Sequence, residues 1–398
     1  MEQRPMVVVG ASLAGLRAVE AARKAGYPGR LVLVGAEEHL PYDRPPLSKA
    51  FLDAANDEPE PTTFRTEAEL AELDVELRLG TAATGLDAAA EEVALGSEWL
   101  PYSALVIATG AHPRPLPGEH PTGVHTLRTL ADAQHIRRAL DTGARTVVVG
   151  GGFIGSEIAS AARKRDHQVT IVEMAPMPLT KAVGEQMAAA CAGLHARNGT
   201  ELRCGVAVER IEGDGHVERV VLSDGAVLDA DLVVVGAGAV PTTDWLEGSG
   251  LTLDDGVVCD ETLATGAPGV YAAGDVARWT NPLFGERMRL EHWTSAAEQG
   301  GRAARNALDS CAASPYSTVP YFWSDWYQDR LQMVGVADAD EIRVVGDVED
   351  DKWLALYRRG DLLTGTLGLN MQGKIMKYRA MIKRQISWDE ALSFAGVQ

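Results

Sequence analysis

The sequence has few cysteines and no long apolar run. Its four cysteines, Cys191, Cys204, Cys259 and Cys311, are scattered along 398 residues without a CxxC pair. This excludes a disulfide scaffold and the usual ligand spacing of a zinc or iron–sulfur site, so we expect no bound metal, and it suits a reducing cytoplasm. No apolar run approaches the about 20 residues that a membrane span needs. The first residues, MEQRPM, lack the basic and apolar regions of a secretory signal. We therefore expect a cytoplasmic protein without a membrane anchor.

Basic residues are outnumbered, and the formal net charge is −19. An acidic surface repels nucleic acid and anionic lipid, so neither is the expected main partner. The hydrophobic share of 46% and the charged share of 23% are ordinary for a globular protein. The length predicts two or three domains.

One structural unit occurs twice. Residues 4–38 and 144–174 each begin with a β-branched run, continue through a glycine-rich turn into an alanine-rich helix, and return in a second apolar run. This pattern predicts a β-α-β unit in each of the two segments. Further short apolar strands, at 104–111, 232–241 and 269–277, end in small residues, which leave room for a ligand to lie against the backbone.

The last 80 or so residues differ in pattern. Residues 321–335 and 350–370 alternate apolar and polar side chains and are rich in aromatics, which predicts antiparallel strands, and 374–387 reads as a basic helix. We expect an α/β fold with two Rossmann-like dinucleotide-binding domains and a C-terminal α+β domain.

The second glycine-rich turn has the complete dinucleotide-binding pattern. Gly150 permits the tight turn, Gly152 admits the pyrophosphate, and Gly155 lets helix and strand pack closely. Phosphates would then lie at the helix N-terminus, beside Phe153 and Ile154. Glu173, at the end of the next strand, can accept from a ribose 2′-OH and would repel a 2′-phosphate, so NADH is favoured over NADPH. The alternative is a purely structural glycine turn.

The first turn departs from the pattern at one position. Its residues are Gly10, Ala11, Ser12, Leu13, Ala14 and Gly15. Ser12 replaces the middle glycine, and Glu37 follows the second strand as the candidate ribose ligand. Two dinucleotide folds in one chain suggest two dinucleotides, and FAD with a nicotinamide is the economical pair.

Several motifs occur together and in order: PYDRPPLSK (41–49), LVIATGA (105–111), TLRTLADA (126–133), VVVGGGFIGSEIA (147–159), VYAAGDVAR (270–278), EHWTSAAEQG (291–300) and YFWSDWY (321–327). By these motifs the whole chain resembles the FAD-dependent ferredoxin reductases that serve cytochrome P450 and Rieske-type oxygenases, the group of putidaredoxin reductase, with a glutathione-reductase-like fold. The resemblance implies an FAD-binding domain (1–111 and 237–315), an inserted NADH-binding domain (112–236) and a C-terminal α+β domain (316–398).

The resemblance assigns catalytic roles to two residues. Lys49 matches a lysine carried to the flavin by the Pro45-Pro46 elbow, where a cation stabilises the reduced, anionic flavin. Glu157 matches a glutamate near the nicotinamide that can pair with the lysine. Without the resemblance, a surface lysine and a glutamate on a solvated helix face would be the simpler interpretation.

The resemblance also implies further cofactor contacts. Ala14 and Glu37 would touch the FAD pyrophosphate and adenosine, Ala83 the adenine, and Asp275 the ribityl chain. The remaining positions are Arg44, Arg128, Trp293 and Trp323 around the flavin, and Gly236 beside the nicotinamide. A turn aspartate, and tryptophans of a hydrophobic core, are the plain alternatives for Asp275, Trp293 and Trp323.

The implied reaction passes electrons from NADH through FAD to a [2Fe–2S] ferredoxin. Disulfide reductases of this fold carry a cysteine pair next to the flavin, where this chain has RPPLSKAFLDA, so a thiol mechanism is not expected. Rubredoxin or quinone reduction, and an NADH-responsive flavoprotein with a binding or signalling role, stay open as alternatives.

An acidic reductase needs a local basic patch to bind an acidic ferredoxin. Arg302 and Arg305 share one helix face, and the densest basic run contains Lys377 and Lys383. We expect docking near these four residues, and a monomer or weak dimer; an ordinary solvated surface is the alternative for each of them.

Overall fold

The computed structural model describes residues 4–53 and 62–397. The chain divides into two compact units. Unit 1 comprises Met1–Asp43, Thr62–His112 and Val240–Pro320, and unit 2 comprises Arg44–Pro61, Pro113–Ala239 and Tyr321–Gln398. The boundaries of the FAD-binding, NADH-binding and C-terminal domains that the family resemblance implies stay a prediction.

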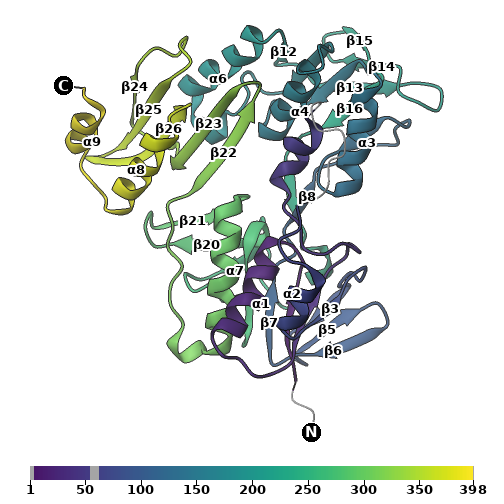
Figure 1. Cartoon of the computed structure of the whole chain (residues 1–398), viewed down its shortest axis with the longest axis vertical. Coiled ribbons are helices and arrows are strands. Elements are labelled where there is room, and N and C mark those ends of the chain that lie inside the picture. Colours follow the sequence, from purple (N-terminus) through teal and green to yellow (C-terminus); the bar gives the residue numbers. More distant parts are fainter. Residues whose placement is uncertain (1–3, 54–61, 398) are drawn as a thin grey trace. The chain divides into compact units, whose positions relative to one another are not determined.

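Unit 1 contains a five-stranded sheet in the order β19-β7-β1-β2-β3, and every neighbouring pair is parallel (Figure 1). Its strands are β1 (Met6–Val9), β2 (Leu31–Val34), β3 (Val75–Arg78), β7 (Ala104–Ile107) and β19 (Val270–Ala272). Every residue of β1, β2 and β7 is buried. Continuous apolar strands of this kind fit a parallel sheet that is covered on both faces.

Unit 2 repeats this arrangement in a second five-stranded sheet, ordered β12-β11-β10-β16-β9. Its strands are β9 (Val124–Thr126), β10 (Thr146–Val149), β11 (Val169–Glu173), β12 (Glu201–Cys204) and β16 (Leu232–Val235). Again all neighbours are parallel. In both sheets the first strand of the β-α-β unit lies at the centre, so the internal similarity seen in the sequence extends to the sheets.

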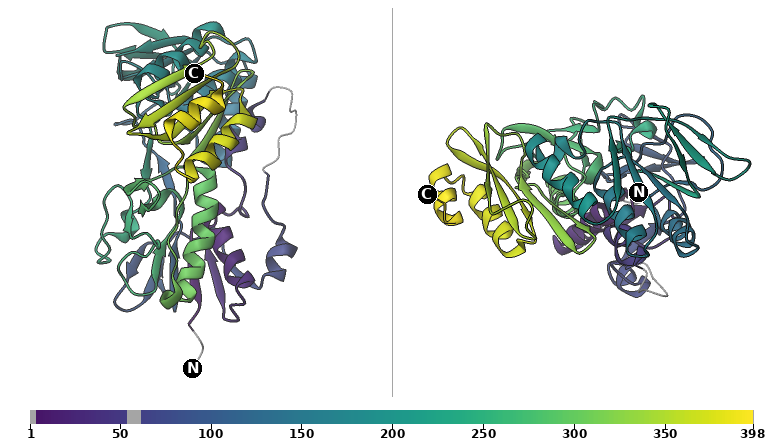
Figure 2. Two further views of the ribbon diagram at one scale, coloured as in Figure 1. Left: turned by 90° about the vertical axis from the view of Figure 1, so that its left-hand side faces the viewer. Right: turned by 90° about the horizontal axis from the view of Figure 1, so that it is seen from above.

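Helix α1 (Leu13–Lys24) connects β1 to β2 and packs along α7 (Trp293–Leu308), as the purple and green helices of Figures 1 and 2 show. Small residues allow the close approach. A Cβ added to Gly300 would lie 2.1 Å from the carbonyl oxygen of Ala14. The alanine-rich sequence of α1 therefore serves helix packing directly beside the first glycine turn.

The rest of unit 1 is peripheral to the parallel sheet. Strands β4 (Gly85–Asp87), β5 (Glu92–Leu95) and β6 (Glu98–Pro101) form one antiparallel sheet, and β18 (Val257–Cys259), β20 (Ala277–Asn281) and β21 (Glu286–Arg289) form another mixed one. Short helices are α2 (Glu67–Glu72), η3 (Asp244–Leu246), η4 (Gly274–Val276) and η5 (Ser310–Ala312). Strands β8 (Ala111–Pro113) and β17 (Ala239–Pro241) form a separate two-stranded sheet.

The segments between the parallel strands of unit 2 form four helices: α3 (Leu130–Asp141), α4 (Phe153–Arg163), α5 (Thr180–Val183) and α6 (Glu185–Arg197). Strands β13 (Val208–Glu212), β14 (Arg219–Leu222) and β15 (Val227–Asp229) form an antiparallel layer whose apolar side chains share a core with β10 and β16. Helix α3 starts with a capping box, in which the Thr129 hydroxyl and the Asp132 carboxylate each accept a backbone N–H.

The C-terminal part is an antiparallel sheet in the order β22-β23-β26-β25-β24, as the alternating sequence predicts. Its strands are β22 (Tyr321–Trp326), β23 (Asp329–Gly335), β24 (Glu341–Val345), β25 (Trp353–Arg359) and β26 (Leu362–Leu369). The basic helix, expected over 374–387, is α8 (Gln372–Lys383), and Ser387 instead caps a further helix, α9 (Trp388–Ala395). The predicted fold class is confirmed.

The stretch around Pro45 and Pro46 is neither a long helix nor a strand. It forms a 3₁₀ turn, η1 (Pro45–Ser48), followed by η2 (Ala50–Leu52). Proline suits the first positions of such a turn because their N–H groups have no partner within it. The turn buries Leu47 and Ser48 and leaves Lys49 between the two short helices.

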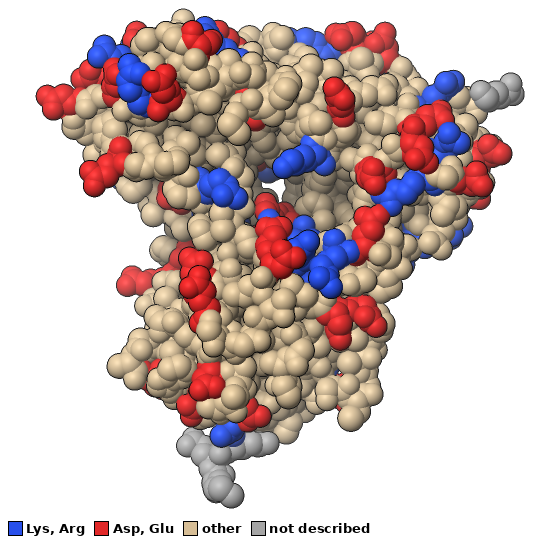
Figure 3. Space-filling model, turned by 180° about the vertical axis from the view of Figure 1, so that it is seen from behind, with Lys and Arg blue, Asp and Glu red and all other residues tan. Residues whose placement is uncertain are grey.

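Charges of opposite sign lie next to each other over much of the surface seen in Figure 3. Among the described residues, the exposed Arg145 donates two hydrogen bonds to the carboxylate of Asp231 at 2.8 and 2.9 Å. Exposed pairs of this kind add little stability. Within residues 4–53 and 62–397, no helix combines the length and the apolar character that crossing a membrane requires.

A buried polar cluster joins α4 and α6 to the C-terminal sheet. The imidazole of His195 on α6 is fully buried; its Nε2 lies 3.2 Å from Ser156 Oγ and its Nδ1 lies 2.7 Å from the Tyr327 hydroxyl. The ring also stacks on Trp326, with 4.9 Å between centroids. Burial lowers the pKa of His195 from 6.5 to about 4, because the charged imidazolium is poorly solvated there.

This histidine predicts acid sensitivity of folding. The unfolded chain takes up a proton near pH 6.5 and the folded chain only near pH 4, so folding stability falls as the pH drops through this interval. Between pH 7 and pH 5 we expect His195 to account for a loss of about 2 kcal/mol. Urea unfolding of wild type and His195→Gln at both pH values measures it. An equal loss in both proteins would contradict the assignment.

Candidate functional site

The turn between β10 and α4 depends on two glycines for its shape. Gly150 has φ of +102°, and a Cβ added there would lie 2.4 Å from the carbonyl oxygen of Gly236. A Cβ on Gly155 would lie 2.2 Å from the carbonyl oxygen of Gly150. Neither position can carry a side chain, since real Cβ atoms do not approach backbone so closely. The fold itself therefore demands glycine at these two positions.

Gly152 is different, because the fold leaves it room. Its φ is −75°, and a Cβ added there would find only one atom within 4 Å, the carbonyl oxygen of Gly236 at 3.9 Å. Gly152 is also the N-cap of α4, no side chain caps the helix start, and the first turn has no acidic residue. The result is an open space in front of unpaired helix N–H groups, which fits an anionic phosphate.

The turn between β1 and α1 repeats this geometry. Gly10 has φ of +120°, and its added Cβ would lie 2.1 Å from the carbonyl oxygen of Ala108. The Cβ of Gly15 would lie 1.9 Å from the carbonyl oxygen of Gly10. Ser12 is the N-cap, does not cap the first turn with its side chain, and precedes a first turn without acidic residues. Leu13 and Ala14 are buried in that turn.

A carboxylate lies at the end of the second strand of one β-α-β unit and shortly after that of the other. Glu173 is half-buried and accepts from the N–H of Gly151 and from that of Ala175, both at 2.8 Å. Glu37 is also half-buried and accepts from the hydroxyl of Tyr42 at 2.6 Å. Glu173 is thus fixed against its own glycine turn, where a ribose hydroxyl would be recognised.

Lys49 and Glu157 meet in unit 2. The ammonium nitrogen of Lys49 lies 2.8 Å from both carboxylate oxygens of Glu157. The side chain of Glu157 is 3% exposed and that of Lys49 is 20% exposed. A solvated helix face, the simpler interpretation of Glu157 from sequence, is therefore wrong. A buried carboxylate requires such a partner, because an isolated charge is costly to take out of water.

Three neutral donors complete the surroundings of this carboxylate. The Ser48 hydroxyl donates to Oε2 at 2.5 Å, the Ser324 hydroxyl donates to Oε1, and the N–H of Asp325 donates to Oε1 at 3.3 Å. Sequence reasoning did not name either serine as a site residue. Ser48 directly precedes Lys49, and Ser324 is a polar residue between the apolar Phe322 and Trp326 on one face of β22; both signals could have identified them.

The other predicted residues of unit 2 lie at several places. Arg44 donates to the carbonyl oxygen of Arg128 at 2.7 Å. Phe153 packs against Phe322, with 4.5 Å between ring centroids. Trp323 is only partly buried and stacks on Tyr321, so it is not a core tryptophan. Two positions remain: Ile154 is 45% exposed, and Gly236 directly follows β16 and lies against Gly150.

Unit 1 holds the remaining predicted residues. The indole N–H of Trp293 donates to Asp43 at 2.8 Å, and its ring is partly exposed, so Trp293 is likewise no core residue. Asp275 lies in η4, and Ala83 lies in the loop before β4. Unit 1 thus collects the first glycine turn, Glu37 and these three residues.

The four cysteines are free thiols, and none lies on η1 or η2. Burial raises the pKa of Cys191 and of Cys259 to about 12 each. A reactive thiol needs the opposite shift. Among the described residues 4–53 and 62–397, no group of three or more His, Cys, Asp and Glu could hold a metal ion.

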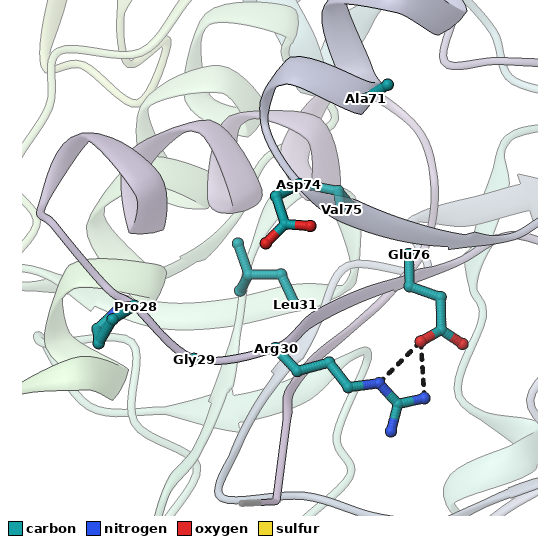
Figure 4. A pocket seen from close by; sticks show the side chains of 8 residues that line it. All are labelled: Pro28, Gly29, Arg30, Leu31, Ala71, Asp74, Val75 and Glu76. Atoms are coloured by element: carbon teal, nitrogen blue, oxygen red, sulfur yellow. Dashed lines mark hydrogen bonds and ion pairs between the residues drawn. The ribbon is translucent and has the colours of Figure 1, made fainter.

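A surface hollow of about 520 Å³ in unit 1 lies away from the predicted site residues (Figure 4). It is lined by Pro28, Gly29, Arg30, Leu31, Ala71, Asp74, Val75 and Glu76, and an Arg30–Glu76 ion pair lies at its rim. None of these residues belongs to either glycine turn.

Two dinucleotide-binding folds in one chain are typical of a dinucleotide-dependent oxidoreductase. Residues 4–300 match the pyridine nucleotide-disulphide oxidoreductase family, and residues 321–394 match the reductase C-terminal family. The chain therefore belongs to the pyridine nucleotide-disulphide oxidoreductases. Members of this family that act as ferredoxin–NAD(+) reductases use FAD and NADH.

Individual relatives agree with this. The chain is 36% identical to the ferredoxin–NAD(+) reductase component of the anthranilate 1,2-dioxygenase system of Burkholderia cepacia, covering 100% of this chain and 95% of the relative. It is 38% identical to the corresponding biphenyl dioxygenase component of Paraburkholderia xenovorans, covering 89% and 86%. The crystal structure of a covalent putidaredoxin reductase–putidaredoxin complex matches with a TM-score of 0.92 at 33% identity, covering 97% and 94%. The recognised family is confirmed.

The contrast between Gly152 and Gly155 gives a prediction. Gly152→Asp places a favourable N-cap on α4, so we expect an unfolding temperature no lower than that of wild type. Its carboxylate fills the open space and repels phosphate, so NADH should bind at least about a hundredfold more weakly. Gly155→Ala, in contrast, should lower both stability and NADH affinity.

Thermal unfolding and fluorescence titration with NADH measure these effects. Unchanged NADH affinity in Gly152→Asp would show that phosphate does not bind at the start of α4.

Proposed function

We propose that this chain passes electrons from NADH, through bound FAD, to a [2Fe–2S] ferredoxin that supplies a cytochrome P450 or a Rieske-type oxygenase. The observation that carries the proposal is the buried Lys49–Glu157 pair in a chain with two dinucleotide folds. FAD, when bound, accepts a hydride from NADH and releases electrons singly to an iron–sulfur acceptor. Relatives that are named ferredoxin–NAD(+) reductases, and a reductase–putidaredoxin complex of the same fold, support the choice of acceptor.

The residues of the chain bind and orient in this scheme. The N–H groups at the starts of α1 and α4 would hold the pyrophosphates, and Glu37 and Glu173 would hold ribose hydroxyls. Lys49 would present its ammonium group to the flavin and would stabilise negative charge there. By the family resemblance, Asp275 would hold the ribityl chain, and Arg128, Trp293 and Trp323 would contact the flavin.

The domain assignment belongs to the same proposal: residues 1–111 and 237–315 bind FAD, 112–236 bind NADH, and 316–398 form the C-terminal domain. The reductase C-terminal match over residues 321–394 supports the last of these. We further propose, from the sequence, that the protein is cytoplasmic and a monomer or weak dimer.

The first test is an anaerobic titration of the purified protein with NADH and with NADPH, followed by flavin absorbance. We expect NADH to bleach the flavin readily and NADPH poorly, because Glu173 repels a 2′-phosphate. Glu173→Ala should narrow the gap between the two coenzymes by about tenfold or more, the size of one charge contact.

Both outcomes of this titration are informative. If neither coenzyme reduces the flavin, the proposed function is wrong. If the preference for NADH is undiminished in Glu173→Ala, another residue discriminates between the coenzymes.

The basic run of the C-terminal helix divides into two faces. Lys377 and Lys383 are six positions apart on α8, which places them about 120° apart around the helix axis. Lys377 lines a shallow hollow together with Arg384 and Phe394. Lys383 lies one turn after Arg379, whose guanidinium is 5.7 Å from the ring centroid of Tyr321.

The Arg379–Lys383 face is the better candidate for ferredoxin docking, since Tyr321 stacks on Trp323, a residue proposed for the flavin site. Arg302 and Arg305 on α7 form a separate candidate in unit 1.

Charge reversal tests the docking proposal. We expect Lys383→Glu to raise the KM for ferredoxin about tenfold or more and Lys377→Glu to raise it less, while flavin reduction by NADH stays unchanged in both. Steady-state ferredoxin reduction at low ionic strength, with stopped-flow flavin reduction as control, measures this. A larger effect of Lys377→Glu would move docking to the Phe394 face, and unchanged KM in both variants would exclude α8.

A further inference from the structure

We propose that Ser324 is a positioning residue for the flavin reaction, which fixes the carboxylate of Glu157 and thereby sets how far the ammonium group of Lys49 is available to the flavin. This inference rests on the proposed function, because it uses the proposed place of Lys49 beside the flavin. Ser324 itself touches Glu157 and Trp326, and it acts through the carboxylate.

The direction of the Ser324 hydroxyl is fixed by its neighbour. The indole N–H of Trp326 donates to Ser324 Oγ at 2.8 Å, and an indole N–H can only donate. The hydroxyl proton of Ser324 is therefore directed to its other partner, Oε1 of Glu157. Ser324 is fully buried and Trp326 is 1% exposed, so water does not compete for either bond.

Trp326 is itself held in place. Its ring stacks on His195, and the next residue, Tyr327, donates its backbone N–H to Ser160 Oγ at 2.5 Å. Ser160 lies on α4, three residues after Glu157. Strand β22 thus contacts helix α4 through Ser324 and the N–H of Asp325, which both reach the carboxylate, and the residue after the strand, Tyr327, contacts Ser160.

The neutral donors around Glu157 weaken the hold of its carboxylate on Lys49. Oε1 and Oε2 each receive a serine hydroxyl, and Oε1 also receives the N–H of Asp325. These bonds stabilise a buried carboxylate without neutralising it. Because these donors already stabilise part of the negative charge, the carboxylate attracts the ammonium group of Lys49 less strongly than a carboxylate without such donors would. Loss of the Ser324 bond would draw the ammonium group towards Glu157 and away from the flavin.

The experiment is a double-mutant cycle of Ser324→Ala and Lys49→Met in the FAD-loaded protein. The readouts are the midpoint potential of the bound flavin by spectroelectrochemistry and the rate of its reduction by NADH in stopped flow. In the wild-type background, Ser324→Ala should lower the potential and slow reduction about tenfold, the effect of one hydrogen bond to a charged group. In the Lys49→Met background, Ser324→Ala should change neither quantity.

Ser160→Ala is the matched control. It removes a buried hydroxyl of α4, which contacts the residue after β22, without touching Glu157. We expect it to lower the unfolding temperature and leave the flavin potential unchanged. Trp326→Phe is the second variant if Ser324→Ala does not fold: it removes the N–H that directs the serine proton, and should shift the potential in the same direction by less.

The possible results separate the two levels of the proposal. If Lys49→Met leaves the potential unchanged, the proposed role of Lys49 at the flavin is wrong. If Lys49→Met shifts the potential but Ser324→Ala does not, or if Ser324→Ala shifts it equally in both backgrounds, the positioning role of Ser324 is wrong.

Discussion

The buried carboxylate of Glu157 is the constraint around which unit 2 is built. A carboxylate that is 3% exposed is tolerated only when its charge is paired and its oxygens accept hydrogen bonds. Its donors come from two separate segments: η1 with the residue after it, and β22, which donates through a side chain and through its backbone. These segments and α4 must therefore reach one point together. The Pro45-Pro46 elbow has its physical reason here, since a rigid short turn brings Ser48 and Lys49 to the same carboxylate.

Two kinds of glycine occur in the second glycine turn, and they answer to different requirements. Gly150 and Gly155 are required by backbone contacts within the protein, whatever binds there. Gly152 is required by none of its neighbours, and its missing side chain serves only the space in front of α4. In the first turn the corresponding space is narrowed by Ser12, while the two structural glycines, Gly10 and Gly15, are kept. The two turns therefore share the glycines that the backbone requires, and they differ at the position in front of the helix, which is Ser12 in the first turn and Gly152 in the second.

The sequence predicts the fold well and the buried site only in part. Continuous valine runs around glycine turns identify both β-α-β units, and alternation identifies the C-terminal sheet, because these signals are local. The partners of Glu157 lie 108 and 109 residues before it and 167 and 168 residues after it, and no local pattern predicts such contacts. Lys49 and Glu157 were predicted by resemblance to a family, and neither serine was predicted. The helix expected over 374–387 ends earlier because Ser387 caps a new helix, whose start signal lies within the same basic run.

The distribution of thiols and charges also bears on how electrons leave the chain. A disulfide close to a flavin accepts electrons in pairs, whereas an iron–sulfur cluster accepts one at a time. In this chain the segment that could carry such a thiol pair carries Ser48 and Lys49, and both groups are engaged with Glu157. Cys191 and Cys259 are buried where the thiolate is disfavoured, on elements other than η1 and η2. At the place proposed for Lys49, a cation held by a buried carboxylate would offer the flavin electrostatic stabilisation and no covalent partner, which would suit single-electron release to an external acceptor.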